Sequence, residues 1–335
     1  METFAFLVHP INIEQLKNFW PLTKFIPNFF LNPFLKKIPP FKVSCIKNVR
    51  SVTGRETEGY IIACPLLPKQ ILKLKEKFVL NRIIQAGRLA QDLGAKIVGL
   101  GGYTSVVADK GITVAKNLNI AVTTGNSYTV ALVIESIRKG CQIMNIDLKK
   151  ARVAIIGATG SIGDASTRML ANEVSEIVIT ARHKDKLEAL KDRVSKISPC
   201  RIIIEENAHI AIRNADIVIV TTSTPDALID ASELKLGSVA CDVSVPKNIS
   251  GRNKERKDVF IFDGGLATYP GNIDFGANTE LPEGQIYGCL AETMILVLDS
   301  RFENFSLGND LDLEKINKIQ KLAKKHGFEE VKIRR

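Results

Sequence analysis

A glycine-rich turn near the middle of the chain constrains its fold more than any other segment. The mostly apolar run Arg152-Val-Ala-Ile-Ile156 leads directly into Gly157-Ala-Thr-Gly-Ser-Ile-Gly163, and a helical pattern follows. In a strand–turn–helix unit, glycines at this spacing permit the tight turn, the close approach of a pyrophosphate and the packing of helix on strand. The N–H groups at the helix start then face the phosphates. The turn predicts a dinucleotide site formed by Gly157, Thr159, Gly160, Ser161, Ile162 and Gly163.

Strand and helix patterns alternate regularly after residue 151. Strands are expected at 152–156, 176–180, 201–204, 216–221, 238–242 and 258–262, and helices at 161–173, 184–196 and 207–214. This alternation is typical of a Rossmann-type doubly wound parallel sheet. Two further helices are expected at about 283–303 and 311–326.

The first 145 residues also read as an α/β mixture. Strands are expected at 4–8, 97–100 and 120–122, a hairpin or a tight connection around Thr53-Gly54-Arg55, and helices at 69–93, at 113–118 and from about 126 to 144. We therefore expect a substrate-binding α/β domain at 1–145 and a nucleotide-binding Rossmann domain at 146–280. The C-terminal helices, at 281–335, are expected to pack back on the first domain.

The residue after the second strand of the Rossmann unit distinguishes the two nicotinamide dinucleotides. An NAD site usually ends this strand with Asp or Glu, which binds the ribose 2′-hydroxyl. Here the strand ends in Thr180-Ala-Arg182, with Lys184 two residues further on. Since a guanidinium can bind a 2′-phosphate, NADP is favoured over NAD. Thr222 follows the fourth strand and is expected to line the nicotinamide side of the cofactor, on topology alone.

Composition and charge exclude several classes of protein. A 335-residue chain that is 45% hydrophobic and 24% charged fits two globular domains. Six cysteines without a C-x-x-C pair and four scattered histidines give little support for a metal site or a disulfide framework. The net charge of +10 suits an acidic partner or serves solubility alone, and no nucleic-acid-binding motif is visible.

The N-terminal region bears on the cellular location. It lacks the basic n-region of a signal peptide, and no apolar run is long enough to span a membrane, so a cytoplasmic protein is expected. The aromatic segment at 25–35, followed by Lys36 and Lys37, is either a peripheral membrane contact or a buried loop broken by prolines.

A cysteine near the C-terminus is a candidate nucleophile. No Tyr-x-x-x-Lys acid–base pair follows the sheet, so the short-chain alcohol dehydrogenase interpretation fails. Cys289 lies early in an expected helix, directly after a glycine, where a helix start can lower the pKa of a thiol. Gln285 is expected one helical turn earlier and on the same face, where it could stabilise an oxyanion. From spacing alone, a buried structural cysteine is the more common alternative.

Several segments spread over nearly the whole chain match one family. They are Leu100-Gly-Gly-Tyr-Thr-Ser105, Thr124-Gly-Asn126, Val153-Ala-Ile-Ile-Gly-Ala-Thr-Gly160, Thr180-Ala-Arg182, Pro246-Lys-Asn248, Gln285-x-x-x-Cys289-x-Ala-Glu292, Asn304-Phe-Ser306 and His326-Gly-Phe328. With them the chain resembles the long-chain fatty acyl–acyl-carrier-protein reductases of cyanobacteria, which form fatty aldehydes.

This resemblance implies a reaction. It implies that Cys289 takes the acyl group as a thioester, which NADPH then reduces to an aldehyde. The acyl donor would be an acyl carrier protein, whose acidity suits the basic chain, or an acyl-CoA. Gly102, Tyr103, Thr104, Ser105 and Asn126 are candidate substrate-cleft residues, although a capped turn and a helix cap are their plainer roles.

The identity of the substrate and the roles of Glu292 and Cys64 are open at this point. Residues 20–45 and Ala267-Thr-Tyr-Pro-Gly-Asn272 differ from the family, which bears on substrate identity. Glu292 either orients a partner or is a solvated helix charge, and Cys64, before Pro65, is expected to be structural. Two other functions remain: a dehydrogenase of a polar keto or amino acid, similar to shikimate dehydrogenase, and a non-catalytic NADP-sensing or carrier-binding protein.

Overall fold

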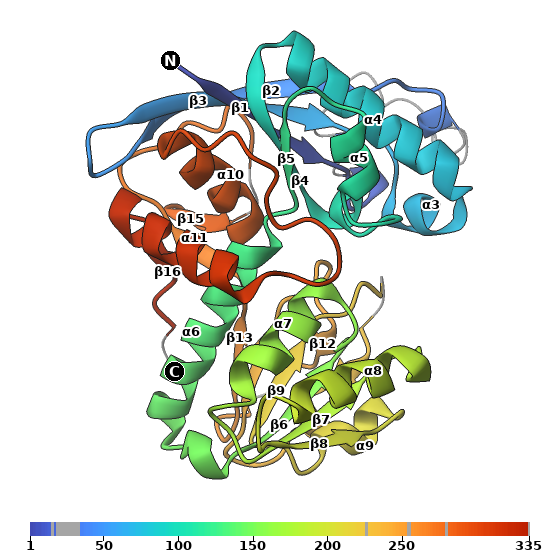
Figure 1. Ribbon diagram of the computed structural model, residues 1–335, viewed down its shortest axis with the longest axis vertical. Helices are drawn as coiled ribbons and strands as arrows, with labels where there is room; N and C mark the ends of the chain where they lie inside the picture. Colours follow the sequence, from blue (N-terminus) through green and yellow to red (C-terminus); the bar gives the residue numbers. More distant parts are fainter. Residues whose placement is uncertain (15–16, 18–33, 225–226, 253–255, 279–280, 334–335) are drawn as a thin grey trace. The chain divides into compact units, whose positions relative to one another are not determined.

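The computed structural model describes residues 1–14, 17, 34–224, 227–252, 256–278 and 281–333. The chain divides into two compact units (Figure 1). Unit 1 comprises residues 1–125, 268–308 and 318–329, and unit 2 comprises residues 126–267, 309–317 and 330–335. Both are built on a sheet with parallel strands, so the expected α/β fold with a Rossmann-type sheet is confirmed.

Unit 1 is organised around a five-stranded sheet with the order β2-β3-β1-β4-β5. The strands are β1 (Thr3–Val8), β2 (Phe41–Arg50), β3 (Glu56–Ala63), β4 (Ala95–Leu100) and β5 (Ala121–Thr123). Strands β3, β1, β4 and β5 run parallel, and β2 pairs antiparallel with β3, which confirms the hairpin. The carboxyl ends of the four parallel strands therefore lie at one edge of the sheet.

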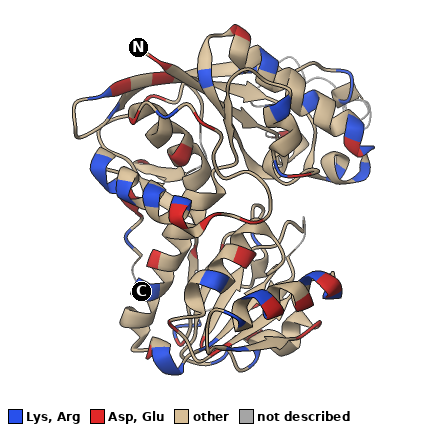
Figure 2. Cartoon of the chain, in the orientation of Figure 1, with Lys and Arg blue, Asp and Glu red and all other residues tan. Residues whose placement is uncertain are grey.

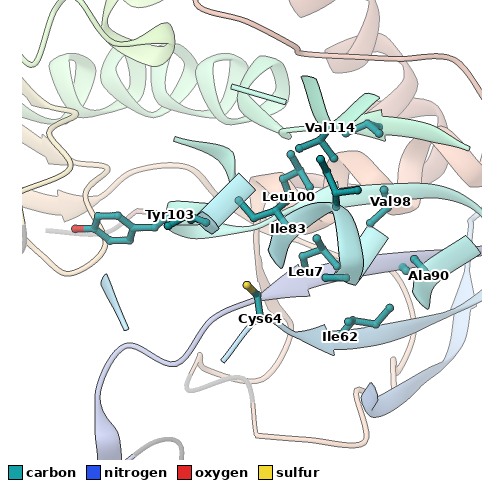
Figure 3. Close-up of a cluster of buried hydrophobic side chains, with 14 of the residues drawn as sticks. Leu7, Ile62, Cys64, Ile83, Ala90, Val98, Leu100, Tyr103 and Val114 are labelled. Atoms are coloured by element: carbon teal, nitrogen blue, oxygen red, sulfur yellow. The ribbon is translucent and has the colours of Figure 1, made fainter. Parts of the chain in front are cut away.

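Helices cover both faces of this sheet. They are α3 (Pro68–Lys73), α4 (Glu76–Asp92), α5 (Ile112–Lys116) and α10 (Gly288–Leu298), with a 3₁₀ turn, η2, at Gly102–Ser105. Leu7 of β1 and Ile83 of α4 belong to one buried apolar cluster, which also holds Cys64 (Figure 3). Phe6, on the other face of β1, lies beside Gly99, where Thr293 of α10 also approaches. Successive side chains of β1 thus point alternately to the sheet face covered by α4 and to the face covered by α10.

Unit 2 contains a six-stranded, fully parallel sheet with the order β13-β11-β9-β6-β7-β8. The strands are β6 (Arg152–Ile156), β7 (Glu176–Thr180), β8 (Arg201–Ile204), β9 (Ile217–Val220), β11 (Val239–Asp242) and β13 (Phe260–Asp263). Counted from β6, this is the strand order 3-2-1-4-5-6 of the dinucleotide-binding fold, whose reversal of direction lies between β6 and β9.

The remaining elements of unit 2 connect or flank these strands. The helices are α6 (Asn126–Met144), α7 (Ser161–Leu170), α8 (Lys184–Ser195) and α9 (Ala208–Ile212). The 3₁₀ turns are η3 (Leu148–Lys150) and η4 (Ala231–Glu233), and β10 (Ile229–Asp230) pairs with β12 (Ile249–Ser250). Each strand expected after residue 151 is present within two residues of its expected ends.

Two expected helices differ from the structure. The expected helix at 69–93 is two helices, α3 and α4, because Leu74 is extended (φ −72°, ψ 159°) and ends the first. The expected helix at 283–303 begins with a strand, β15 (Gln285–Tyr287), and only then becomes α10, which ends at Leu298. The last helix, α11 (Leu313–His326), agrees with expectation, and β14 (Leu266–Thr268) and β16 (Glu329–Glu330) are short.

Two further observations concern membranes. Among the residues described, no helix is long and apolar enough to cross a bilayer. The aromatic segment suggested as a membrane contact lies mostly outside the described residues. Of its described part, Phe34 is exposed and Leu35 is fully buried.

Candidate active site

The glycine-rich turn of unit 2 has the close packing expected of a phosphate-binding turn. Gly157 has φ +88°, and its N–H donates to the carbonyl oxygen of Thr180 at 2.8 Å. A Cβ on Gly163 would lie 2.5 Å from the Gly157 carbonyl oxygen, so only glycine lets α7 pack this closely on the turn. A Cβ on Gly160 would meet only that oxygen, at 3.3 Å. Packing therefore accounts for Gly157 and Gly163, whereas Gly160 is explained better by the approach of a ligand.

The first turn of α7 provides the groups that a phosphate requires. Gly160 is the N-cap of this ten-residue helix and has no side chain to accept a hydrogen bond, so no cap competes with an anion for the N–H groups and the positive end of the helix dipole. Thr159, Ser161 and Ile162 surround this point, and the Asn126 amide donates to Ser161 Oγ at 2.9 Å. The turn therefore fits a dinucleotide pyrophosphate, and it brings Asn126 beside a predicted cofactor residue.

The end of β7 exposes a guanidinium. Arg182 lies two residues beyond the strand and is exposed. Within the part of the chain that the structure describes, no hydrogen bond or ion pair engages its side chain. Lys184 instead pairs with Glu206 at 3.1 Å. An unengaged guanidinium at this strand end is suited to a 2′-phosphate on the adenosine ribose.

The end of β9 is held by a buried asparagine that sequence reasoning did not single out as functional. Thr222 and Thr224 both donate their hydroxyl hydrogens to Asn248 Oδ1, the second at 2.6 Å. Asn248 is fully buried, and its amide donates to the carbonyl oxygens of Thr224 and Pro246, each at 3.1 Å. The backbone around Thr222 is thereby fixed at the edge where a Rossmann unit binds nicotinamide.

Cys289 is the second residue of α10 in unit 1, and the turn after β5 packs directly against it. A Cβ on Gly125 would lie 2.1 Å from Cys289 Cα and 2.4 Å from Cys289 Cβ. Gly125 also has φ +73°, which glycine adopts without strain. The matching segments around Thr124 and Cys289 thus meet in space, although they are more than 160 residues apart in sequence.

Several features around Cys289 shift the pKa of its thiol in opposite directions. Cys289 is half-buried, yet the desolvation of its sulfur raises the pKa of Cys289 to about 12, and the negative charge of Glu292 adds to this. The N–H groups of Leu290 and of Cys289 itself act to lower the pKa, but they do not outweigh burial. The N–H groups at the helix start thus act on the thiol in the expected direction, but desolvation outweighs them in the free protein.

The proposed pairing of Gln285 with Cys289 on one helix face is also wrong. Gln285 lies in β15, and its N–H donates to the carbonyl oxygen of Pro282 at 3.1 Å. Gly284, with φ +78°, precedes the strand. Because Tyr287 is the N-cap of α10, the helix starts three residues too late for an i,i+4 relation. Any contribution of Gln285 would have to come from the strand leading into the helix.

The candidate substrate residues of 102–105 form η2 at the carboxyl end of β4. Tyr103, Thr104 and Ser105 are buried, and Gly102 is exposed with φ +54°. The hydroxyls of Thr104 and Ser105 donate to the carbonyl oxygens of Gly101 and Gly102, at 2.8 and 2.7 Å. These two hydroxyls thus stabilise the turn itself, which agrees with the plainer of the two roles considered for them.

His9 is a residue that the sequence did not indicate. It follows β1 at the same sheet edge, and its Nε2 accepts a hydrogen bond from the Tyr103 N–H at 2.9 Å. Burial lowers the pKa of His9 to about 4, so the ring is neutral at physiological pH. A lone histidine after a strand gives no signal of this contact, since its partner is a backbone group 94 residues away.

Glu292 is fully buried, which excludes the solvated helix charge considered above. Its Oε1 accepts hydrogen bonds from Thr123 Oγ1 at 2.5 Å and from Ser306 Oγ at 2.7 Å. Cys64 is buried as well, and burial raises the pKa of its thiol to about 12. In the described ranges, no cluster of three or more His, Cys, Asp or Glu side chains could hold a metal ion.

Comparisons with known proteins match unit 2 to one family and nearly the whole chain to a reductase. Residues 139–263, most of unit 2, match the shikimate / quinate 5-dehydrogenase family. The chain is 29% identical over 313 residues to the long-chain acyl-[acyl-carrier-protein] reductase of Synechococcus elongatus, which covers 88% of this chain and 89% of that protein. These similarities and the fold are those of an oxidoreductase with a nicotinamide cofactor.

Two other relatives are matched over part of their length. The chain is 32% identical over 286 residues to the aminotransferase PigE of Serratia sp., which covers 84% of this chain but 33% of that protein. This chain thus spans about a third of the Serratia protein. It is also 25% identical over 203 residues to the glutamyl-tRNA reductase of Chlorobaculum parvum, or 57% of this chain and 45% of that protein.

Proposed function

We propose that this protein reduces a long-chain acyl-[acyl-carrier-protein] thioester to a fatty aldehyde, with NADPH as the reductant and a thioester on Cys289 as the intermediate. The observation that carries the proposal is the setting of Cys289. A cysteine at the start of α10 lies against the Gly125 turn, in a chain that also contains a Rossmann unit. The similarity to an acyl-[acyl-carrier-protein] reductase over 88% of the chain supports the same reaction.

The proposed chemistry has two stages. The sulfur of Cys289 attacks the thioester carbonyl, the bond to the carrier sulfur breaks, and the carrier leaves as a thiol with the proton that Cys289 gives up. Bound NADPH would supply the hydride to the acyl carbon. Collapse of the resulting thiohemiacetal anion then releases aldehyde and leaves the thiolate of Cys289, which a proton from water converts back to the thiol. The N–H groups of Cys289 and Leu290 at the start of α10 are suited to stabilise negative charge in both stages, and Gln285 is a further candidate donor.

The raised pKa of Cys289 has a place in this scheme. A neutral thiol in the free protein resists oxidation and non-specific alkylation, because the thiolate is the reactive species. We infer that the thiol loses its proton in the course of acyl transfer rather than before it.

The cofactor is assigned to unit 2. We propose that the pyrophosphate binds the turn from Gly157 to Gly163, that the 2′-phosphate binds Arg182, and that Thr222 lies at the nicotinamide. Gly102–Ser105 and Asn126 stay proposed substrate residues, of which Gly102 is the most exposed.

The partner is proposed from charge. Helix α11 buries Ile316, Ile319 and Ala323 on one face. Lys318, Lys321 and Lys325 lie on the opposite face, and Figure 2 shows the basic residues along this helix. An acidic carrier protein would be attracted to such a face.

Intact-mass measurement tests the nucleophile and the substrate class together. Incubating the protein with acyl carrier protein loaded with a long acyl chain, without NADPH, should add one acyl mass. Cys289→Ala should abolish the adduct and aldehyde formation while NADPH binding persists, and Cys45→Ser, a partly exposed cysteine in β2, should behave like the unchanged protein. Normal turnover by Cys289→Ala would refute the proposal. Reduction of a polar keto acid without any adduct would favour a dehydrogenase of the shikimate type instead.

A further inference from the structure

The buried carboxyl group of Glu292 lies at the centre of a hydrogen-bond network that reaches the Gly125 turn. It accepts hydrogen bonds from Thr123 Oγ1 and Ser306 Oγ, at 2.5 and 2.7 Å, and all three residues are at most 4% exposed. Thr123 Oγ1 in turn accepts the N–H of Gly125 at 3.2 Å. A chain of contacts therefore runs from carboxylate to hydroxyl to the backbone of the glycine that covers Cys289.

The second hydroxyl secures the other side of the same turn. Ser306 offers its backbone carbonyl to the hydroxyl of Thr124. The Phe305 N–H donates to the carbonyl oxygen of Val122 in β5 at 3.0 Å. The Val122 N–H in turn donates to Asn304 Oδ1 at 2.9 Å. Residues 304–306 therefore lie along the end of β5, and Glu292 bonds to the hydroxyl at each side of the turn.

We propose that Glu292 is a positioning residue, which holds the Gly125 turn against Cys289 through Thr123 and Ser306 and so shapes the space in which the thiol is acylated. The link to acylation rests on the proposed function; the positioning itself does not. Glu292 lies three residues after Cys289, on the same side of α10 and about one turn further along. Its bonds thus couple α10, one turn beyond the thiol, to the residues at each side of the turn.

The turn follows a short strand and contains a glycine in a left-handed conformation, so its position depends on its hydrogen bonds. Strand β5 has three residues, and Gly125 is a backbone with a left-handed φ of +73° and no side chain to pack. Hydrogen bonds to a charged acceptor are stronger than neutral ones, and burial strengthens them further. Without the carboxylate, Thr123 and Ser306 would be left as two buried hydroxyls with no acceptor in α10.

The charge of Glu292 provides a measurement that a purely structural role would not change. Because its negative charge adds to the rise in the pKa of Cys289, Glu292→Gln should make the thiol more acidic. The pH profile for alkylation of Cys289 by iodoacetamide should then shift to lower pH, with a severalfold faster rate at pH 8 and the protein still folded. Acyl transfer from the carrier should nevertheless become slower, because the amide holds the two hydroxyls less well.

The hydroxyl of Thr123 isolates the positioning effect. Thr123→Val keeps the shape of the side chain but removes the relay to Gly125, and we expect it to slow acylation of Cys289 at least tenfold, whereas Thr123→Ser should restore the rate. Thr57→Val is the matched control, since Thr57 is equally buried in β3 but donates to the backbone of Glu2. The rate for a bulky maleimide relative to iodoacetamide should rise in Thr123→Val and stay constant in Thr57→Val.

These measurements separate the two hypotheses. If the unchanged protein forms no acyl adduct, the proposed function fails, but the alkylation rates still test the positioning. An unchanged ratio of maleimide to iodoacetamide rates in Glu292→Gln, or equal reagent selectivity in Thr123→Val and Thr57→Val, would overturn the inference. Should Thr123→Val not fold, the ratio of maleimide to iodoacetamide rates in Glu292→Gln decides.

Discussion

Replacing Gly125 by alanine perturbs the thiol site at its tightest contact. The added Cβ would lie 2.1 Å from Cys289 Cα, so the turn and the start of α10 must separate by about 1.3 Å to reach an ordinary contact of 3.4 Å. Two costs add. A non-glycine residue with left-handed φ costs about 1–2 kcal/mol, and overpacking a well-packed site costs about 1–3 kcal/mol.

The expected effects on stability and rate follow from these figures. We expect the free energy of unfolding to fall by about 2–5 kcal/mol. For a unit of this size that lowers the melting temperature by roughly 4–20 °C. Since a misplacement of about 1 Å can cost a factor of about 10² in rate, acylation of Cys289 should slow by at least that factor.

Gly54→Ala supplies the control for backbone strain. Gly54 lies in the hairpin turn of unit 1, has φ +80°, and has nothing within 4 Å of the position of a Cβ. The free energy of unfolding of Gly54→Ala should therefore fall only by the cost of the left-handed φ, about 1–2 kcal/mol. Acylation of Cys289 in this variant should proceed at the normal rate. Urea unfolding and the time course of the acyl adduct measure both variants. If Gly125→Ala unfolds and acylates like Gly54→Ala, the close contact with Cys289 has no consequence and the reasoning is refuted.

Four further predictions concern the cofactor, the thiol and the partner. Gly160→Ala should leave the melting temperature of the free protein nearly unchanged but weaken NADPH binding at least tenfold by calorimetry, whereas unchanged binding would contradict a ligand at this glycine. Arg182→Ala should lower the preference for NADPH over NADH by about ten- to a hundredfold in kcat/KM, since it removes a charge-assisted contact to the 2′-phosphate; an unchanged ratio would count against it. Alkylation of Cys289, whose pKa is raised to about 12, should accelerate about tenfold per pH unit from pH 7 to 10 as the thiolate fraction grows; a plateau near pH 8 would contradict the raised pKa. Lys318→Glu combined with Lys321→Glu should raise KM for the acyl carrier protein and reduce its salt dependence, but leave acyl-CoA reduction unchanged; an equal effect on both donors would exclude docking at α11.

The Rossmann unit could be predicted from the sequence because its signals are local. Strand length, the three glycines and the regular alternation all lie within short windows, and the observed strands of unit 2 follow them. The break between α3 and α4 could not be predicted, because no proline or glycine marks Leu74 and the apolar periodicity runs on across it. The strand β15 is three residues long, which is too short to distinguish from the start of a helix.

The environment of the thiol depends on contacts between distant segments. Cys289 could be singled out from its neighbours and from the family resemblance. The burial of Glu292 could not, since its partners Thr123 and Ser306 lie 169 and 14 residues away. The helix start, which favours a lower pKa of Cys289, is visible in the sequence, whereas the extent of the desolvation that opposes it is not.

The two ends of the proposed cofactor site differ in how far the fold depends on them. Arg182 is exposed and lies beyond its strand, so exchanging it alters little besides what it binds. Thr222 shares its acceptor with Thr224 on a fully buried asparagine, whose amide also fixes two backbone carbonyl groups. A single substitution at Arg182 can therefore change the preference for a phosphorylated ribose. A change around Thr222 requires several substitutions together, because its neighbours share the same buried acceptor. Phosphate preference should accordingly drift among relatives while the reaction is retained.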